Sequence, residues 1–335
     1  MNSRIILFAL ALFAVLLPFA CGEEELPQPV PEFNPTPLEL TIADHMPIME
    51  IPEDNPLTVE GVELGRRLFY DKKLHENEEN ACADCHIQSL SFTSDPSVLP
   101  HMNFGWYTNF LWNGKISGTL EDIMLFEVAS FFKTDLNKLK NDEFYPDLFF
   151  EAFGTKAITH ELAARALSQF ERTLLCSNSK FDRVVYENSE FFTDEELLGF
   201  ELFFTEEGDC FHCHGGVLFT DNLFHNNGLD ETFQDIGYAA ISGDENDMGR
   251  FKTPTLRNIE LTAPYMHDGR YATLEEVVNF YSQGLKFSST IDPLMKNVHQ
   301  GGVQLTEEEK SALIAFLKTL TDTSFIKNPS FANPF

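Results

Sequence analysis

Two short motifs in this chain combine cysteine and histidine at a spacing that carries specific chemistry. They are Cys82-Ala83-Asp84-Cys85-His86 and Cys210-Phe211-His212-Cys213-His214. The Cys-x-x-Cys-His pattern is typical of c-type haem attachment, because the two thiols add across the porphyrin vinyl groups and the imidazole binds the iron. The alternative, a pair of zinc or redox sites, needs partners that the remaining Cys21 and Cys176 supply poorly. The motifs therefore predict two covalent haems, with His86 and His214 as iron ligands.

Helical patterns surround both motifs, and signals for β-strands are sparse. Thr193, Thr273 and Thr306 are each followed three residues later by a glutamate, a pairing that caps the first turn of a helix. Each of these pairs, known as a capping box, is followed by apolar residues with helical spacing. They include Leu197, Phe200, Phe203, Val277, Val278, Tyr281, Leu313, Phe316 and Leu317. We expect a mostly α fold of two cytochrome c-like helical domains, 56–190 and 191–335, each with one covalently attached haem c.

The beginning of the chain is typical of an export signal. Arg4 precedes an apolar run from 5 to 20, which is too short for a stable membrane span. Cys21 follows a small residue at the end of this run, which resembles the lipobox of bacterial lipoproteins. We therefore expect residues 1–21 to be a lipoprotein-type signal peptide with Cys21 lipidated, the alternative being an ordinary signal peptidase site nearby. Cys176 ends a helix-like run and is expected to be a small buried hydrophobe.

An acidic, proline-rich segment follows the predicted signal. Because proline fixes φ and donates no hydrogen bond, residues 22–55 are expected to form an extended tether that lies over the surface. The chain carries a formal net charge of −30, which opposes nucleic acid binding and favours cationic partners. Together these features predict an exported protein of the periplasm or cell envelope, anchored through lipid. The sequence does not indicate which membrane face.

A longer pattern in the C-terminal half adds to the haem motifs. It runs from 251 to 258 as Phe-Lys-Thr-Pro-Thr-Leu-Arg-Asn and continues through Tyr-Met-His-Asp-Gly within 261–276. With Asn-Pro-Leu-Thr at 55–58 and Phe-Glu-Arg-Thr-Leu at 170–174, it resembles the signature of bacterial dihaem cytochrome c peroxidases and the related MauG enzymes. The likeness covers nearly everything after residue 50.

This resemblance implies a division of labour between two haems. In the family the C-terminal haem accepts or stores oxidising equivalents, whereas the N-terminal haem meets hydrogen peroxide at an open iron position. Peroxide is reduced to water by two electrons, which many members draw from a small cytochrome c or a cupredoxin. By that likeness His86 is the proximal ligand of the peroxide-reacting iron and His214 that of the other.

The sixth ligand of the C-terminal iron follows from the same resemblance. Cytochrome c peroxidases place a methionine on the helix after His-Asp-Gly, and the matching position here is Tyr281, as in MauG. A phenolate is a hard anionic donor that favours ferric and higher iron states, whereas a thioether raises the potential. The alternative is that Tyr281 packs on the apolar face of its helix while Met248, Met266 or Met295 serves.

Two further elements concern the space around the haems. Trp112-Asn113-Gly114-Lys115 resembles the family's Trp-Asp-Gly-Arg, so Trp112 is a candidate electron or hole relay, or else an ordinary core residue. The family's glutamine and glutamate positions hold Ile123 and Lys133, and losing an acid or base costs roughly two to four powers of ten in rate. Glu127 is the candidate substitute, unless it is a surface residue. His101 is a candidate resting ligand or a solvated loop residue.

Family members also hold calcium between their domains, through backbone oxygens and one asparagine. Thr262 and Pro264 match the backbone contributors, but the asparagine position falls near Ser97. Fewer hard oxygen ligands predict weak calcium binding.

The functional prediction is a dihaem c oxidoreductase, resembling cytochrome c peroxidase and MauG, that reduces hydrogen peroxide with electrons from a small donor protein. One alternative is a non-enzymatic dihaem electron-transfer or sensor protein, because the family's distal residues are replaced. Another is an oxidase of a partner protein, as MauG is. The sequence does not indicate the donor, the protein substrate or the oligomeric state.

Overall fold

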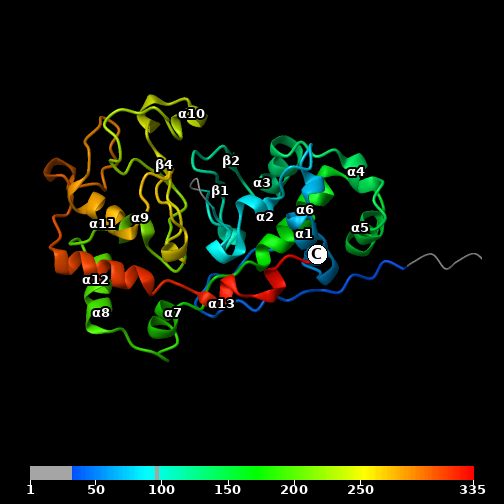
Figure 1. Cartoon of the computed structure of the whole chain (residues 1–335), viewed down its shortest axis with the longest axis horizontal. Coiled ribbons are helices and arrows are strands. Elements are labelled where there is room, and N and C mark those ends of the chain that lie inside the picture. The colour runs from blue at the N-terminus through cyan, green and yellow to red at the C-terminus, as the bar shows by residue number, and fades with distance from the viewer. Residues whose placement is uncertain (1–31, 95–97) are drawn as a thin grey trace, which may run out of the picture. The chain divides into compact units, whose positions relative to one another are not determined.

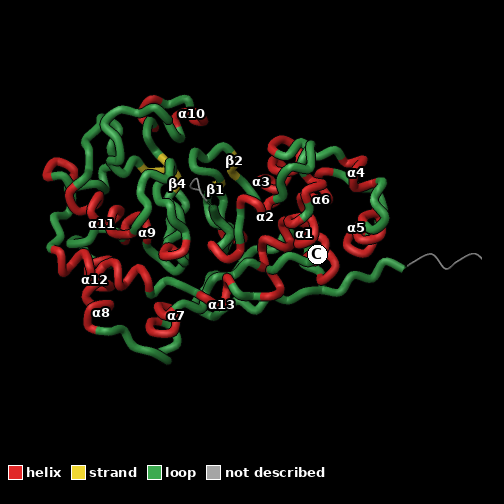
Figure 2. Tube along the Cα trace, viewed as in Figure 1, coloured by secondary structure: helices red, strands yellow, loops and turns green. Residues whose placement is uncertain are grey.

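The computed structural model describes residues 32–94 and 98–335. The predicted signal segment, Cys21 and Ser97 lie outside the described residues. From Phe33 to the C-terminus the chain forms one compact unit. Helices make up most of its regular structure, as Figure 1 and Figure 2 show, which confirms the mostly helical fold. Within the described ranges, no helix is long and apolar enough to cross a membrane.

The first haem motif lies among helices that pack around α1 and α6. The longer members of this group are α1 (Val59–Tyr70), α3 (Leu120–Phe126), α5 (Tyr145–Phe153) and α6 (His160–Thr173). Helix α3 continues into a π-helical turn, Glu127–Phe131. Helices α1 and α6 cross closely because Gly65 has no side chain; a Cβ atom there would lie 1.9 Å from the Ala166 carbonyl oxygen.

The second motif is surrounded by α8 (Asp194–Phe203), α11 (Leu274–Gln283) and α12 (Glu307–Lys318). All three helices begin with the predicted capping boxes, in which the threonine hydroxyl accepts from the glutamate N–H and the glutamate side chain accepts from the threonine N–H. Helices α8 and α12 also cross at a glycine. A Cβ atom on Gly199 would lie 1.9 Å from the Ala312 carbonyl oxygen.

Short helical turns connect these elements. The α-helical ones are α2 (Cys82–Cys85), α4 (Leu136–Lys140), α7 (Lys180–Val185), α9 (Phe211–His214), α10 (Ala239–Ser242) and α13 (Thr323–Ile326). The 3₁₀ turns are Lys72–Leu74, Gln88–Leu90, Phe104–Trp106, Glu245–Asp247, Ile259–Leu261, Val298–Gln300 and Pro329–Phe331. Because most connections are short loops and single turns, the haem motifs are positioned mainly by the longer helices around them.

Two small antiparallel ribbons are the strand pairs of the described chain. Strand β1 (Asn109–Phe110) pairs with β2 (Ile116–Ser117), and β3 (Phe224–His225) pairs with β4 (Phe251–Lys252). The turn between β1 and β2 carries Trp112, and the backbone N–H of Lys252 donates to its carbonyl oxygen at 2.8 Å. This bond joins the segments that carry the two ribbons.

Two large hydrophobic cores and a smaller cluster lie beneath the helices; the cluster consists of Leu229, Phe280, Leu285 and Val298. The N-terminal core includes Leu64, Leu68, Phe69, Phe92, Ile123, Phe149, Leu167 and Phe170, together with Phe325 and Phe331 from the end of the chain. The C-terminal core includes Phe181, Leu202, Phe203, Phe219, Leu274, Val278, Leu313 and Phe316. The last helical turns of the chain thus pack on the N-terminal core, although their residues fall within the predicted C-terminal domain, 191–335. The domain limits stay a prediction.

A fully buried ion pair fixes the segment before the C-terminal core. Both Arg257 and Asp182 have side chains without solvent exposure, and their two hydrogen bonds measure 2.8 and 2.9 Å. Although burial opposes ionisation, hydrogen bonding and attraction from Arg257 hold the pKa of Asp182 below its usual value. His45, from the predicted tether, lies 3.2 Å from the same carboxylate.

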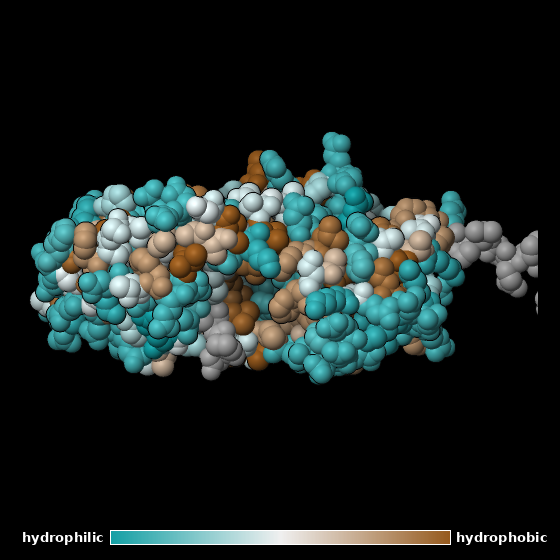
Figure 3. Space-filling view, turned by 90° about the horizontal axis from the view of Figure 1, so that it is seen from above, coloured by the Kyte–Doolittle hydropathy of each residue, from teal (hydrophilic) through white to brown (hydrophobic). Residues whose placement is uncertain are grey.

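The part of the predicted tether that the structure describes lies against the compact unit. Pro37 forms an isolated β-bridge with Thr58, and the His45 ring stacks on Tyr186 with centroids 4.4 Å apart. Met46 and Met49 are buried. On the face drawn in Figure 3, hydrophilic side chains dominate both ends and hydrophobic ones gather between them.

Candidate functional site

The two Cys-x-x-Cys-His motifs adopt the same local structure. Each pair of cysteines spans one short helical turn that ends at the histidine: the His86 N–H donates to the Cys82 carbonyl at 2.8 Å, and the His214 N–H donates to the Cys210 carbonyl at 3.0 Å. All four thiols are free. Both motifs therefore present two thiols and one imidazole from a single turn, which is the arrangement that c-type haem attachment needs.

The two motif histidines are prepared in the same way for binding a metal. Nδ1 of His86 lies 2.9 Å from the Phe92 carbonyl oxygen, and Nδ1 of His214 lies 3.1 Å from that of Phe219. Since a carbonyl only accepts, Nδ1 carries the proton and Nε2 keeps its lone pair. Burial lowers the pKa of His86 to about 3 and that of His214 to about 4, so both are neutral at pH 7. Both histidines therefore present a neutral Nε2 atom that is suited to binding iron.

The C-terminal motif opens into a large cavity. It encloses about 200 Å³, and part of it is open to solvent. Cys210, Cys213 and His214 line it together with largely apolar side chains. An apolar lining that includes both motif thiols and the motif imidazole is consistent with a mainly apolar cofactor such as haem.

Tyr281 lines the same cavity as His214, as its predicted role requires. Its phenol oxygen accepts a hydrogen bond of 2.9 Å from the side-chain amide of Asn227. Burial raises the pKa of Tyr281, so ionisation of the phenol would need a cation such as iron. The alternatives Met266 and Met295 also line this cavity, whereas Met248 is not among its lining residues. Ligation by Tyr281 stays a prediction.

No motif in the sequence marks Asn227. This residue follows β3, and its amide nitrogen lies 2.9 Å from the phenol oxygen of Tyr281 and 3.8 Å from the sulfur of Met266. It therefore contacts two of the candidate iron ligands. Only the folded chain brings β3 beside α11, so the sequence carries no signal for this contact.

Trp112 reaches the C-terminal cavity from the turn between β1 and β2. It is half-buried, and its backbone carbonyl accepts from Lys252. Trp112 thus lies on a segment that belongs to the first half of the sequence and borders the second haem site. This position is compatible with the predicted relay, which stays a prediction.

The N-terminal motif is surrounded by other titratable groups. The rings of His86 and His101 are in contact, with centroids 3.5 Å apart, and Nδ1 of His101 is hydrogen-bonded to Glu171 at 2.9 Å. Burial lowers the pKa of His101 to about 3 and raises that of Glu171 to about 8. His101 is therefore a largely buried group and not a solvated loop residue. Because the rings of His86 and His101 are in contact, a porphyrin plane has no space between them in this arrangement. Binding of His101 to the iron in a resting form stays a prediction.

Glu127 lies at the junction of α3 and the π-helical turn. Burial, and then the charge of Glu171, raises the pKa of Glu127 to about 7. Burial and then the charge of Glu127 raise the pKa of the Cys82 thiol, so this carboxyl group is within electrostatic reach of the motif. By contrast Ile123 is buried in the N-terminal core and Lys133 is exposed. Of these three positions, Glu127 is the one that offers a proton-transfer group to the N-terminal site.

The predicted calcium residues lie after the 3₁₀ turn Ile259–Leu261. The Thr262 hydroxyl donates to the Ile259 carbonyl at 3.3 Å, and a cis peptide bond joins Ala263 to Pro264. The third predicted contributor, Ser97, is outside the described residues. Calcium binding stays a prediction.

A mostly helical chain with two such motifs, one of them lining an apolar cavity, has the features of a dihaem cytochrome. The family profile for di-haem cytochrome c peroxidase matches residues 59–190. The methylamine utilization protein MauG of Methylophilus methylotrophus is 30% identical over 295 residues, which cover 80% of this chain and 84% of that protein. Cytochrome c551 peroxidase of Nitrosomonas europaea is 30% identical over 310 residues, covering 84% and 85%.

Structural comparison agrees with these sequence matches. The crystal structure of a MauG-like protein associated with microbial copper homeostasis is 33% identical, with a TM-score of 0.81, and the match covers 89% of this chain and 99% of that one. The chain therefore belongs to the di-haem cytochrome c peroxidase and MauG family of oxidoreductases. This finding confirms the resemblance inferred from its motifs.

Proposed function

We propose that this protein is a dihaem c oxidoreductase that reduces hydrogen peroxide, with one haem c attached at each motif. Each haem would belong to its own cytochrome c-like domain, 56–190 and 191–335. The observation that carries the proposal is the position of Glu127, a half-buried carboxyl group within electrostatic reach of the N-terminal motif and with a pKa near 7. A group with this pKa exchanges protons efficiently at neutral pH.

Haem iron held by His86 supplies the electron-transfer chemistry when it is bound. A carboxylate oxygen of Glu127 accepts a proton from hydrogen peroxide and returns it to the oxygen that leaves as water. Two electrons and two protons convert one peroxide into two molecules of water. The electrons come from a small donor protein such as a cytochrome c or a cupredoxin, and the net charge of −30 favours a cationic one.

The C-terminal cavity is suited to the other haem. Tyr281 would hold the iron of this haem together with His214, and Trp112 is the proposed relay for electrons or holes. Both line this cavity. We further propose export to the cell envelope and a lipid anchor at Cys21. Mass spectrometry of the mature N-terminus tests the anchor, which an unmodified N-terminal residue would exclude.

A second candidate function is oxidation of a side chain in a partner protein. The observation that favours it is Tyr281, at the position where the resemblance implies tyrosine for MauG and methionine for cytochrome c peroxidases. MauG of Methylophilus methylotrophus is named for methylamine utilization, and the similar crystal structure is described as associated with copper homeostasis. The remaining alternative is a dihaem electron carrier or sensor.

The deciding experiment mixes the purified diferric protein with hydrogen peroxide in a stopped-flow spectrometer. Glu127→Gln is expected to slow the haem spectral change about 10²- to 10³-fold, because a general acid–base group is lost. Glu151→Gln is the matched control, since Glu151 is exposed on α5. Equal rates in the wild type and in Glu127→Gln would remove Glu127 from the mechanism.

Steady-state assays with a reduced small cytochrome c separate the candidate functions. Peroxide turnover supports the peroxidase. Haem reduction without turnover supports the electron carrier, and peroxide-dependent oxidation of a co-purified partner without cytochrome turnover supports the MauG-like oxidase.

Calcium at Thr262 and Pro264 is a weaker proposal. Treatment with a calcium chelator is expected to slow turnover and calcium to restore it. Turnover that is indifferent to both treatments would exclude a calcium requirement.

A further inference from the structure

Lys252 on β4 is buried in an unusual electrostatic environment. Its side chain is 4% exposed. Its ammonium lies 3.4 Å from the Thr253 carbonyl oxygen and 4.6 Å from the centroid of the Tyr107 ring. Across the described ranges it forms no salt bridge with a carboxylate. A buried ammonium group without an anion is unfavourable, so this position requires a physical explanation.

A second buried lysine shows the usual solution. Lys310 on α12 is 7% exposed, and its ammonium lies 2.8 Å from a carboxylate oxygen of Glu307. The contrast shows that Lys252 lacks a carboxylate partner among the described side chains.

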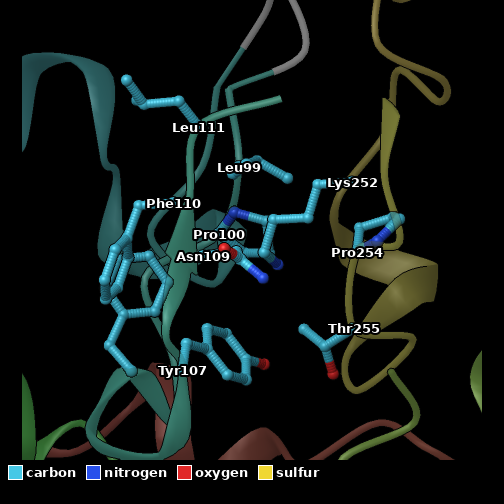
Figure 4. Close-up of a pocket in the computed structure, with 10 residues that line it drawn as sticks. Leu99, Pro100, Tyr107, Asn109, Phe110, Leu111, Lys252, Pro254 and Thr255 are labelled. Atoms are coloured by element: carbon cyan, nitrogen blue, oxygen red, sulfur yellow. The ribbon is translucent and has the colours of Figure 1, made fainter. Parts of the chain in front are cut away.

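Lys252 borders two spaces. It lines the large C-terminal cavity together with His214 and Tyr281. It also lines a smaller pocket formed by residues of the segment 99–111 and by Pro254 and Thr255, where Figure 4 draws it between the two sets of side chains. The backbone holds it there, because its N–H donates to the Trp112 carbonyl and β4 pairs with β3.

The other basic residues that line the large cavity already have partners. The His225 ring is hydrogen-bonded at 2.7 Å to both Asp221 and Asp292, which raise its pKa to about 9 against the opposing effect of burial. The His267 ring stacks on Phe251 with centroids 3.5 Å apart. Among the described lining residues, Lys252 is therefore the cation that is left without a carboxylate.

We propose that the ammonium of Lys252 binds a carboxylate of the cofactor in the C-terminal cavity, namely a haem propionate. Haem carries two propionates, and a buried carboxylate needs a cation or hydrogen-bond donors. This inference rests on the proposed attachment of haem at Cys210, Cys213 and His214. Burial lowers the pKa of Lys252 to about 7, and a bound carboxylate would favour the charged form.

The test compares Lys252→Met, which removes the charge but keeps an unbranched side chain of similar length, with Lys252→Arg, which keeps the charge. Each haem of the purified dihaem protein is titrated by spectroelectrochemistry at pH 6. Losing a positive charge beside a haem favours its ferric state. Lys252→Met is therefore expected to lower the reduction equilibrium constant of the C-terminal haem at least tenfold, or 59 mV for one electron.

Lys310→Met is the matched control, since it removes a buried lysine that does not line the cavity. It is expected to leave both potentials unchanged, as is Lys252→Arg for the C-terminal haem. Equal C-terminal potentials in the wild type and Lys252→Met would overturn the proposal. A shift confined to the N-terminal haem would overturn it too, because the carboxylate would then belong to the other cofactor.

Resonance Raman spectra provide a second readout that does not depend on the potential. The propionate bending modes of the wild type are expected to shift in Lys252→Met and to be retained in Lys252→Arg. If Lys252→Met fails to fold, Lys252→Gln replaces it in the same comparison. Propionate modes that are identical in the wild type and in this neutral variant would overturn the proposal.

Two controls separate this inference from its premises. Titration with acetate tests a free carboxylate as the partner: a saturable change in the wild-type C-terminal potential would overturn the assignment to propionate. Haem content is measured first by the pyridine haemochrome assay. Fewer than two haems in the wild type would refute the proposed dihaem function itself, whereas two haems with potentials that do not respond to Lys252 would refute only this inference.

Discussion

The two haem-attachment regions share a scaffold but differ in the side chains around it. In each, two helices cross at a glycine that would clash with a carbonyl oxygen if it carried a Cβ atom, at Gly65 and at Gly199. In each, the motif histidine donates from Nδ1 to a nearby carbonyl. The shared features are those that hold a haem, because both prepare a neutral imidazole on a rigid support.

The surroundings of the two motifs differ in chemistry. Beside the N-terminal motif lie Glu127, with a pKa near 7, and the hydrogen-bonded pair His101 and Glu171. The C-terminal motif faces a large cavity that contains Tyr281 and, on its border, Lys252. Two carboxyl groups and an imidazole lie near one motif, whereas a tyrosine and a lysine line the cavity of the other. A common scaffold can therefore present different chemistry at two sites when different elements supply the neighbouring side chains.

The largest expected effect concerns the ion pairs of the two regions. Asp182→Asn leaves Arg257 charged in a fully buried site, so it is expected to lower the free energy of unfolding by about 3–5 kcal/mol. Glu121→Gln breaks the pair with Arg172, in which Glu121 remains 20% exposed. It is expected to cost about 1.5–3 kcal/mol. Denaturant titration of both variants measures the two costs, and equal losses would contradict the inferred difference in burial.

The pH dependence of the same pair has a defined sign. Because the pKa of Asp182 is depressed in the folded protein, the stabilisation is present above the ordinary aspartate pKa of about 4. It is lost as the pH falls through the folded pKa. The difference in stability between the wild type and Asp182→Asn is therefore expected to shrink as the pH falls below about 4, and a difference that does not change with pH would count against this explanation.

The second prediction concerns proton transfer, which is proposed for the N-terminal site alone. If the carboxylate of Glu127 accepts the peroxide proton, its pKa near 7 makes the reaction fastest above pH 7. Below the pKa the rate is expected to fall about tenfold per pH unit, or about a hundredfold from pH 7 to pH 5. Stopped-flow rates across this range measure the acidic limb of the pH–rate profile. This limb is expected to disappear in Glu127→Gln. A limb that survives in this variant would assign the titration to another group.

The third prediction tests whether the two helix crossings are equivalent. Gly65→Ala and Gly199→Ala each place a Cβ atom 1.9 Å from a backbone oxygen, so the helices must move apart. Each is expected to destabilise the protein by about 1–3 kcal/mol. Thermal unfolding followed at the haem bands measures this loss, with Glu201→Ala at an exposed position of α8 as the control. Wild-type stability in one variant would mean that only one crossing is tightly packed.

Local sequence signals predict the parts of this molecule that depend on neighbours in the chain. The capping boxes at Thr193, Thr273 and Thr306 start helices as expected, since each box is completed within four residues. The haem motifs are likewise read from five adjacent residues. Cys176 is buried as expected, because an apolar run already indicates its environment.

Contacts that form only in the folded chain cannot be predicted from such local patterns. Glu171 belongs to a recognisable pattern, but its burial beside His101 depends on packing around α6. Lys252 likewise lies in the most recognisable run of the chain, and nothing in that run indicates that its ammonium lacks a carboxylate. The sequence left open whether Glu127 is a surface residue. Its partial burial depends on how α3 packs near the first motif, which no local pattern indicates.

The smallest expected effect concerns Asn227 and tests the chemistry of the C-terminal site. Its amide donates to the phenol oxygen of Tyr281 at 2.9 Å, a hydrogen bond that typically contributes ~0.5–1.5 kcal/mol. If Tyr281 binds the iron, removing this donor leaves more electron density on the phenolate, which favours the ferric state. Asn227→Ala is therefore expected to lower the reduction equilibrium constant of the C-terminal haem by up to about tenfold, with the N-terminal haem unchanged.

A double-mutant cycle decides whether this effect passes through Tyr281. In a Tyr281→Phe background the phenol oxygen is absent, so Asn227→Ala is expected to have no further effect on the potential. Additive shifts would mean that Asn227 acts independently of Tyr281, and Met266, which its amide also approaches at 3.8 Å, would be the next residue to test. If Met266 proved to be the ligand, the C-terminal iron would be bound by a thioether. The two haem regions would differ in potential as in a cytochrome c peroxidase, and the case for MauG-like chemistry would lose its main support.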